Sequence, residues 1–194
     1  MPFAPVRFLL LATALALAGC QAPSLNPLFL PTDRVLLPGF EDHWADAKHN
    51  HMFTVKPPQN FTYEVVMRRN GPPSPWTYEA RLVKLGDQIY ADMLLQSAPE
   101  HFDGCIGCIP ARSIWKLNLD PQSRTMKPAY LDGAWLNKHL KANPKSIAHV
   151  WNLVEDERHA ILTAPTEALR AFVTRFAGEK NALNEWETLH RCHH

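Results

Sequence analysis

Apolar and polar side chains alternate along the middle of the chain. Between Phe61 and Met67 the odd-numbered residues are apolar and most of the even-numbered ones are polar. Similar alternating or short apolar segments follow at residues 76–82, 89–95, 111–119 and 125–131. A two-residue period puts successive side chains on opposite faces of a strand, and the short turns between these segments favour antiparallel pairing. The pattern predicts a curved antiparallel β-sheet meander, which could close into a partial barrel.

Two further features refine the predicted sheet. Pro128 lies within the last of these segments and has no N–H for a ladder hydrogen bond, which predicts an edge or a bulge at this strand. Residues 149–154 and 159–162 favour a β-hairpin across the charged turn of residues 155–158.

The last third of the chain also carries the helical period. Apolar residues recur at the spacing of one helix face at Leu169, Phe172, Val173 and Phe176. A shorter helix is predicted over residues 134–141, with Asp132 as its cap. A final helical segment is predicted to present Leu183, Trp186 and Leu189. We therefore expect an α+β fold, in which C-terminal helices pack against the antiparallel sheet.

The first residues have the pattern of an export signal. An unbroken apolar run from Phe8 to Ala18 follows a short region whose single charge is Arg7. Its 11 residues would span about 16 Å as a helix, against the ~30 Å of a bilayer core. A signal peptide over residues 1–19 therefore explains the run better than a transmembrane helix does.

The signal ends in Leu17-Ala18-Gly19-Cys20, which resembles the lipobox of bacterial lipoproteins. The resemblance implies that the Cys20 thiol receives a diacylglyceryl group, that the chain is cleaved before Cys20, and that acyl chains such as palmitate hold the protein on the lipid bilayer. More than one acyl chain gives stable anchoring. Gln21 follows in place of the Asp that is typical of inner-membrane retention. The expected location is therefore the bacterial cell envelope, on the periplasmic side of the outer membrane.

Two further stretches are similar to segments of uncharacterised lipoproteins of Gram-negative bacteria. One is Trp135-Leu136-Asn137-Lys138-His139-Leu140 followed by Asn143-Pro144, and the other runs from Ile161 through Leu169 to Phe172. In such proteins a strand meander precedes a short helix and a final strand-to-helix step. The resemblance implies a fold and no particular activity.

Proline spacing divides the mature chain into two parts. The segment after Cys20 contains Pro23, Pro27, Pro31 and Pro38. Proline at this spacing prevents a continuous helix and favours extended backbone. We interpret residues 20–58 as a Pro-rich tether, whose apolar residues 28–30 could dock on the body, and residues 59–194 as a single α+β domain.

Composition and charge exclude several classes of protein. The 194 residues include 20 Lys+Arg and 19 Asp+Glu, and removal of the signal with Arg7 leaves 19 of each. A neutral chain argues against nucleic acid as a partner. Hydrophobic residues at 46% exclude a disordered chain. The sequence also lacks the G-x-S-x-G, Walker and H-E-x-x-H motifs, so we expect that the protein is not an enzyme.

Three cysteines remain beside the lipidated one, and they allow three interpretations. Cys105 and Cys108 form a CxxC pair, and Cys192 lies near the C-terminus. A structural disulfide among them suits an oxidising periplasm. A zinc or copper site could instead combine the pair with Cys192 and with His190, His193 or His194. A thiol–disulfide active site is the third interpretation, but no helix pattern follows the motif to lower a thiol pKa.

A second group of metal-ligating side chains lies near the start of the mature chain. His43, His49 and His51 fall within nine residues of each other. Surface histidines in a polar loop explain the group as well as a weak metal site does. Together with the C-terminal histidines they favour some affinity for transition metals.

These observations lead to two hypotheses of function. The first is a membrane-anchored periplasmic lipoprotein that serves as a non-catalytic binding or envelope-accessory module. Its expected partners are the lipid bilayer, through acylated Cys20, and an envelope protein or a small ligand; no nucleic acid and no cofactor are expected. The alternative is a metal-handling lipoprotein that binds zinc or copper through the CxxC pair and the His-rich C-terminus.

Overall fold

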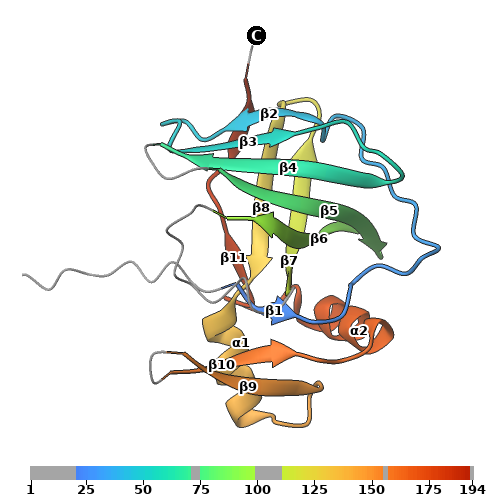
Figure 1. Ribbon diagram of the computed structural model, residues 1–194, viewed down its shortest axis with the longest axis vertical. Coiled ribbons are helices and arrows are strands. Elements are labelled where there is room, and N and C mark those ends of the chain that lie inside the picture. Colours follow the sequence, from blue (N-terminus) through green and yellow to red (C-terminus); the bar gives the residue numbers. More distant parts are fainter. Residues whose placement is uncertain (1–20, 71–74, 99–110, 155–156, 193–194) are drawn as a thin grey trace, which may run out of the picture.

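The computed structural model describes residues 21–70, 75–98, 111–154 and 157–192 (Figure 1). Within them the chain forms β1 (Pro23–Ser24), β2 (Asp42–Ala45), β3 (His51–Val55), β4 (Thr62–Arg69), β5 (Trp76–Leu85), β6 (Gln88–Ser97), β7 (Arg112–Asp120), β8 (Thr125–Leu131), α1 (Gly133–Ala142), β9 (His149–Val154), β10 (Glu157–Leu162), α2 (Thr166–Phe176), β11 (Leu183–Glu185) and β12 (Leu189–Arg191). None of the helices in these residues is both long and apolar enough to cross a membrane.

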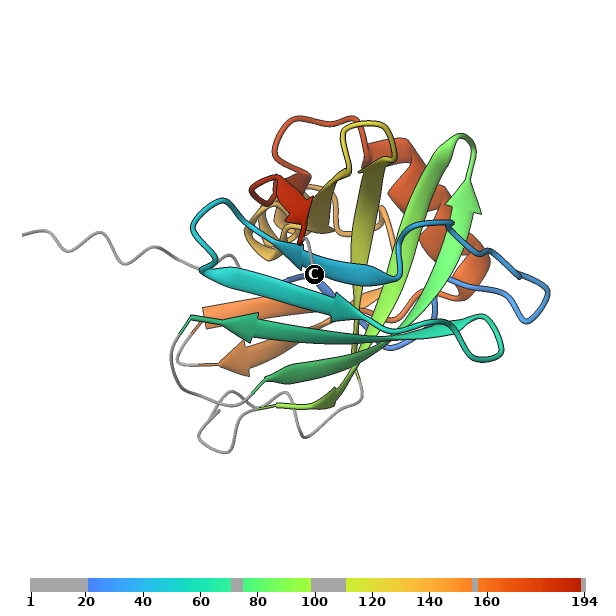
Figure 2. The same cartoon turned by 90° about the horizontal axis from the view of Figure 1, so that it is seen from above.

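Eight strands close into an antiparallel barrel. The order around the barrel is β8-β12-β2-β3-β4-β5-β6-β7, and β7 pairs again with β8 to complete the ring. Consecutive strands from β2 to β8 are neighbours, so the meander predicted from alternation is confirmed and closes fully. Figure 2 shows the barrel from above, with α2 outside the wall of strands.

The first hydrophobic core fills the inside of the barrel. Its side chains alternate along the strands, so that Ala80 and Leu82 of β5 and Ala91 and Met93 of β6 point inward. Aromatic rings occupy the end of the barrel nearest β11: Trp186 lies 5.1 Å from both Phe53 and Trp115, centroid to centroid. Edge-to-face rings at this spacing pack favourably.

A second core lies between the outer wall of the barrel and the remaining elements. Val83, Tyr90 and Ile114 point outward from β5, β6 and β7 and join a buried cluster with side chains of α1, α2 and β10. Asp132 caps α1 by accepting a hydrogen bond from the Trp135 backbone N–H at 2.6 Å. The helices predicted over 134–141 and around Leu169 are thus present, as α1 and α2.

The described part of the chain is nevertheless mostly β, with two short helices, which is less helical than the expected α+β fold. The third predicted helix is wrong, because Leu183 lies in β11 and Leu189 in β12. Both strands lie beside β8, so β8 has partners on both sides; of the edge or bulge predicted from Pro128, the edge is wrong. The Pro128 carbonyl accepts a hydrogen bond from the Trp186 backbone N–H, so Pro128 lies opposite the break between β11 and β12. At this position no strand residue requires a hydrogen bond from the N–H that proline lacks.

Residues 21–58 are part of the folded domain, which corrects their interpretation as a tether. Ala22 and Leu28 have no exposed surface, and β2 and β3 are barrel strands. The short strand β1 pairs antiparallel with β7 and parallel with β10, so it joins the β9–β10 hairpin to the barrel. The prolines prevent a helix, as expected, but the extended backbone packs against the domain and is not a free linker.

The turn between β3 and β4 contains a strained residue. Gln59 and Thr62 exchange both backbone hydrogen bonds around Asn60 and Phe61, whose φ values are 50° and 62°. Positive φ at both central positions defines a type I′ turn, where the second position normally holds Gly. A bulky side chain in this conformation costs about 1 kcal/mol or more.

We expect Phe61→Gly to stabilise the protein by about 1 kcal/mol, because Gly adopts φ near +60° without a Cβ clash. Gly86→Ala is the matched control: its φ is +60° and no atom lies within 4 Å of a Cβ placed there. We expect that substitution to destabilise the protein by about 1 kcal/mol through the backbone alone. Urea unfolding measures both, and a loss of stability in Phe61→Gly would contradict the strain.

Candidate functional site

Several of the residues proposed from the sequence lie outside the described part of the chain. These are Cys20, Cys105, Cys108, His193 and His194. The described candidates are His43, His49, His51, His190 and Cys192.

The structure brings together two candidates that the sequence separates widely. The backbone N–H of Cys192, which directly follows β12, donates a 2.8 Å hydrogen bond to the carbonyl of His43 of β2. His190 lies two residues before Cys192 on β12 and pairs with Ala45. The His43 ring is already hydrogen-bonded, with Nδ1 3.0 Å from the Thr54 hydroxyl. The backbone hydrogen bond therefore makes Cys192 and His43 neighbours through their backbones, at the exposed side of the barrel where His43 lies.

His49 and His51 belong to the β2–β3 turn, which is organised by a buried carboxylate. Asp46 accepts backbone N–H bonds from Lys48, Asn50 and His51 at 2.8–3.0 Å, and its Oδ2 also lies 3.0 Å from His51 Nδ1. These hydrogen bonds outweigh burial and lower the pKa of Asp46. The His51–Asp46 pair thus holds a turn, and His49 occupies a positive φ in the same turn.

The described residues contain no group of three His, Cys, Asp or Glu side chains that could hold a metal ion. Cys192 follows β12. The backbone N–H of Arg191, the last residue of β12, donates a hydrogen bond to the carbonyl of Arg124 in the β7–β8 turn. The strand ends that flank the CxxC segment, Ser97 and Arg112, lie at the opposite end of β7. Nine residues of β7 separate the two ends by about 26 Å. Cys192 therefore lies near the end of β7 that is remote from Arg112.

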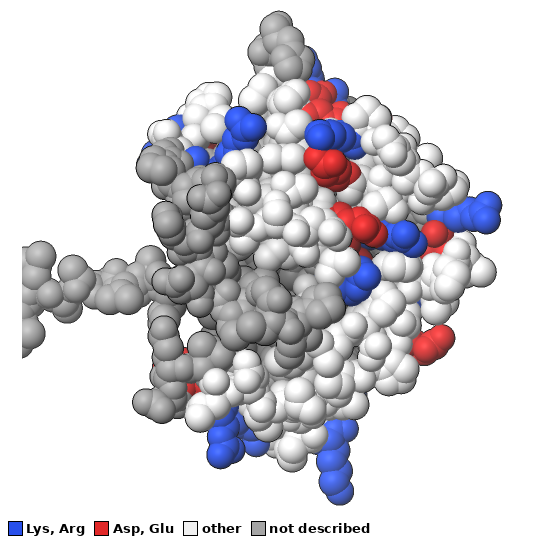
Figure 3. Space-filling model, viewed as in Figure 1, with Lys and Arg blue, Asp and Glu red and all other residues white. Residues whose placement is uncertain are grey.

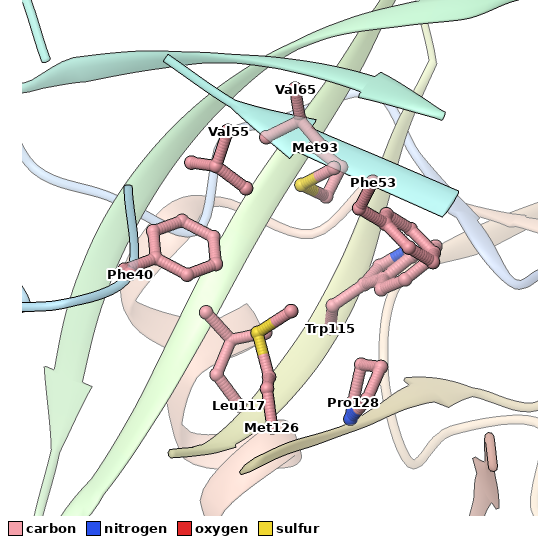
Figure 4. A pocket seen from close by; sticks show the side chains of 9 residues that line it. All are labelled: Phe40, Phe53, Val55, Val65, Met93, Trp115, Leu117, Met126 and Pro128. Atoms are coloured by element: carbon pink, nitrogen blue, oxygen red, sulfur yellow. The ribbon is translucent and has the colours of Figure 1, made fainter. Parts of the chain in front are cut away.

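The interior of the barrel does not provide a ligand site. Its cavity measures about 20 Å³ and is lined by apolar side chains of the first core, such as Met93, Trp115 and Met126. Figure 4 shows these side chains pointing toward one another across the barrel. A small-molecule site usually needs several hundred Å³, and a space of this size holds at most one water. Side chains thus occupy the volume that a carrier barrel would offer its ligand.

A polar recess lies on the outer surface of the barrel. It measures about 490 Å³ and is formed by β7, β8, β11 and the connection after α2. Lys127 forms an ion pair with Glu185 in its wall, and Lys116 and Lys180 also line it. The hydrogen bond from Lys127, its charge and that of Lys116 lower the pKa of Glu185. The recess has the size of a ligand site and a mixture of charges that suits a small polar or anionic group.

A buried ion pair lies beneath the N-terminal segment. The side chain of Asp92 is 1% exposed, and its Oδ1 lies 2.7 Å from Arg112 Nη1. Its second oxygen accepts a 2.5 Å hydrogen bond from the backbone N–H of Leu28. Burial raises the pKa of Asp92, although the Arg112 charge and these hydrogen bonds act to lower it.

Two guanidinium groups hold the aromatic ring that covers this pair. The Arg81 and Arg112 side chains lie 4.6 and 5.3 Å from the centroid of the Phe29 ring. Cation–π contacts at these distances are attractive, and more so when they are shielded from water. Asp92, Arg112 and Phe29 therefore fasten the N-terminal segment to the barrel, which is a structural role.

Sequence reasoning did not single out the ion pair or the recess. A signal for the first was present, because Asp92 is the one charged residue in the otherwise apolar stretch 89–95. A lone charge in a strand that is buried on both faces requires a partner. The recess and the His43–Cys192 contact depend on strand register, which alternation does not determine.

The comparisons with known proteins identify no relative. No protein-family model, no curated protein and no solved structure matches the chain. The geometry of the described residues is therefore the basis for any proposal of function.

We expect Arg112→Met to destabilise the protein by about 3 kcal/mol at neutral pH, because it leaves the Asp92 carboxylate buried without its cation. A buried carboxyl with a raised pKa binds its proton more tightly in the folded state, so stability should return as the pH falls through that pKa. Adding Asp92→Asn should restore much of the loss at neutral pH and abolish its pH dependence.

Arg81→Met is the matched control for this experiment, since Arg81 also contacts Phe29 but pairs with Glu79. Its cost relative to wild type should not change with pH in the same range. Denaturant unfolding of each variant and of wild type at several pH values gives the differences. An Arg112→Met deficit that stays constant as the pH falls would contradict the role of Asp92.

Proposed function

We propose that the protein is a lipid-anchored lipoprotein of the bacterial cell envelope that acts as a non-catalytic binding or accessory module. In this proposal acylated Cys20 holds the protein on the periplasmic side of the outer membrane. The partner is an envelope protein or a small polar ligand, and it binds on the outer surface of the barrel.

The filled barrel is the observation that carries this proposal. A protein that transports or encloses an apolar ligand needs an interior of several hundred Å³. Here aromatic and methionine side chains leave about 20 Å³. Binding inside would require the closed core to open, whereas the outer recess of about 490 Å³ is accessible as it stands.

The polar groups of the described residues support a binding role rather than catalysis. The Asp92 carboxylate is 1% exposed and its two oxygens are bonded to Arg112 and to the Leu28 backbone N–H, so it is engaged in holding the fold. Both oxygens of Asp46 are engaged in the β2–β3 turn, so the neighbouring His51 is positioned by structure. Neither arrangement places a nucleophile beside a base in an open pocket, which is the geometry that hydrolytic chemistry needs.

The lipid anchor can be tested directly with Cys20→Ala. We expect the wild-type chain to sediment with bacterial outer membranes and to carry an N-terminal mass shift from acyl chains at Cys20. The variant should lack this mass and lose stable attachment, because no other acylated residue replaces the lost chains. Cys192→Ser serves as the control for removal of a thiol and should remain membrane-bound. Wild-type protein that is soluble and unacylated in its bacterial host would contradict the proposal.

A second candidate function, the handling of zinc or copper, has one supporting observation. Cys192, which directly follows β12, is hydrogen-bonded through its backbone to His43 of β2, and thiolate and imidazole are ligands for both metals. Two ligands fall short of the four that a structural zinc site uses. We therefore keep metal handling as the less favoured proposal.

We expect the full chain, purified without an affinity tag, to contain well below one equivalent of zinc or copper. The reason is that the described residues supply a pair of ligands where a tight site requires three or four. Elemental analysis by mass spectrometry measures the content. One equivalent of either metal in wild type that is lost in both Cys192→Ser and His43→Gln would instead establish the metal-handling function.

A further inference from the structure

Strand β9 lies at a free end of the sheet. It follows β10 at one end of the strand order, and β10 is its one partner among the described strands. In Figure 1 the β9–β10 hairpin lies at the lower end of the molecule, away from the barrel. Closure removes the edges of the barrel strands, so β9 is the longest edge without a second partner among the described strands, with six residues against three in β11.

The hydrogen-bonding pattern shows which backbone groups of this edge face outward. Thr163 donates to the Ala148 carbonyl, which makes these two residues a hydrogen-bonded pair at the end of the β9–β10 ladder. Pairs alternate along an antiparallel ladder. The N–H and C=O groups of His149, Trp151 and Leu153 therefore point away from β10.

The opposite edge of β10 confirms this assignment. The carbonyl of Leu162 accepts a hydrogen bond from Leu25, and the N–H of Ala160 donates to the Asn137 side chain. Leu162 and Ala160 are the partners of His149 and Trp151 in the ladder. In each of these two pairs the backbone N–H and C=O groups of the β9 residue therefore point away from β10, and those of the β10 residue point away from β9.

Three of the five side chains of residues 149–153 are apolar, and the other two are His149 and Asn152. Val150 is 49% exposed and Leu153 is 64% exposed, which makes Leu153 the most exposed large hydrophobic residue in the described chain. Residues 149–153 contain no Lys, Glu, Asp, Arg or Pro. Proteins normally protect a free edge with such residues, because an unprotected edge pairs with other strands. Residues 149–153 of this edge can therefore accept another strand, and they contain no charged residue or proline that would prevent the pairing.

We propose that a second copy of this chain adds to β9 in antiparallel orientation, so that two molecules share one continuous sheet. The pairing that uses the outward-facing groups is centred on Trp151, which lies opposite Trp151 of the other copy. Leu153 then lies opposite His149, and Val150 opposite Asn152. This association is independent of the lipid anchor and concerns a surface other than the outer recess.

Self-complementarity favours a second copy over an unrelated polypeptide. In the register centred on Trp151 no charge meets a like charge, and the Trp151 and Leu153 side chains of both copies form one apolar row. The two-fold symmetry uses the same patch on each molecule, as in most soluble dimers. Figure 3 shows the surface around the hairpin as largely uncharged, with Lys and Arg at its lower margin.

The proposal is tested by the mass of the full chain in a mild detergent, measured by light scattering with correction for bound detergent. Wild type is expected to be a dimer. Leu153→Pro should halve the protein mass, because proline removes an outward-facing donor and leaves the β9–β10 hydrogen bonds intact. Leu153→Lys should weaken the dimer at least tenfold in dissociation constant without altering the backbone.

Leu36→Lys is the matched control, since Leu36 is 50% exposed and lies in the segment before β2. This variant should remain dimeric, and circular dichroism should show all variants folded. A monomeric wild type, or a dimer that persists in both Leu153 variants, would overturn the proposal.

Hydrogen exchange distinguishes the register and the kind of partner. On dimerisation the amides of Trp151 and Leu153 should become at least tenfold slower to exchange, whereas those of Val150 and Asn152 are already bonded to β10. If these two amides are protected only when another envelope protein is added, the edge serves a different partner and the second-copy proposal is wrong.

Discussion

The closing contact of the barrel is the interaction on which the rest of the structure depends. Three residues, Leu189–Arg191, form a strand between β2 and β8 and complete the ring. Arg191 fixes this strand: its guanidinium donates to the Gly39 carbonyl at 2.7 Å, lies 2.9 Å from the Asp42 carboxylate and stacks over Trp44. A Cβ at Gly39 would lie 2.9 Å from Arg191, so the absence of a side chain permits the approach. Without this strand the first core would face solvent along one side.

Closure also determines where the protein can act. A ring of eight strands has no edges of its own, and its interior is filled by the side chains that closure buries. Any partner must therefore meet the outside of the barrel or the elements attached to it. Those elements are held by a second core and by the clamp of Asp92, Arg112 and Phe29. The same arrangement that excludes a ligand from the centre presents the outer recess and the β9 edge to the surroundings.

The sequence predicted the barrel strands well and the chain ends poorly, for physical reasons. Alternation marks a strand that has one buried face, as in residues 61–67, and it is readable without knowledge of partners. Leu183, Trp186 and Leu189 recur every third residue, which suits a helix, but Leu183 and Leu189 lie in two three-residue strands beside β8 and Trp186 lies in the connection between them. Docking of Leu28 on the body was predictable from its apolar run and is confirmed by its burial, but proline content does not distinguish a free tether from extended backbone that supplies barrel strands. The contact of Cys192 with His43 likewise required the register of β12 on β2.

The central claim is that the barrel interior is a packed core and that binding occurs outside it. Methyl NMR of the full chain tests this directly, because Met93 and Met126 line the interior cavity. On addition of palmitate or phospholipid in mixed micelles, the account predicts that both methionine methyl signals stay where they are, whatever changes occur at surface methyl groups such as those of Leu153. Saturable shifts of the Met93 and Met126 signals would show a ligand inside the barrel and would contradict the account.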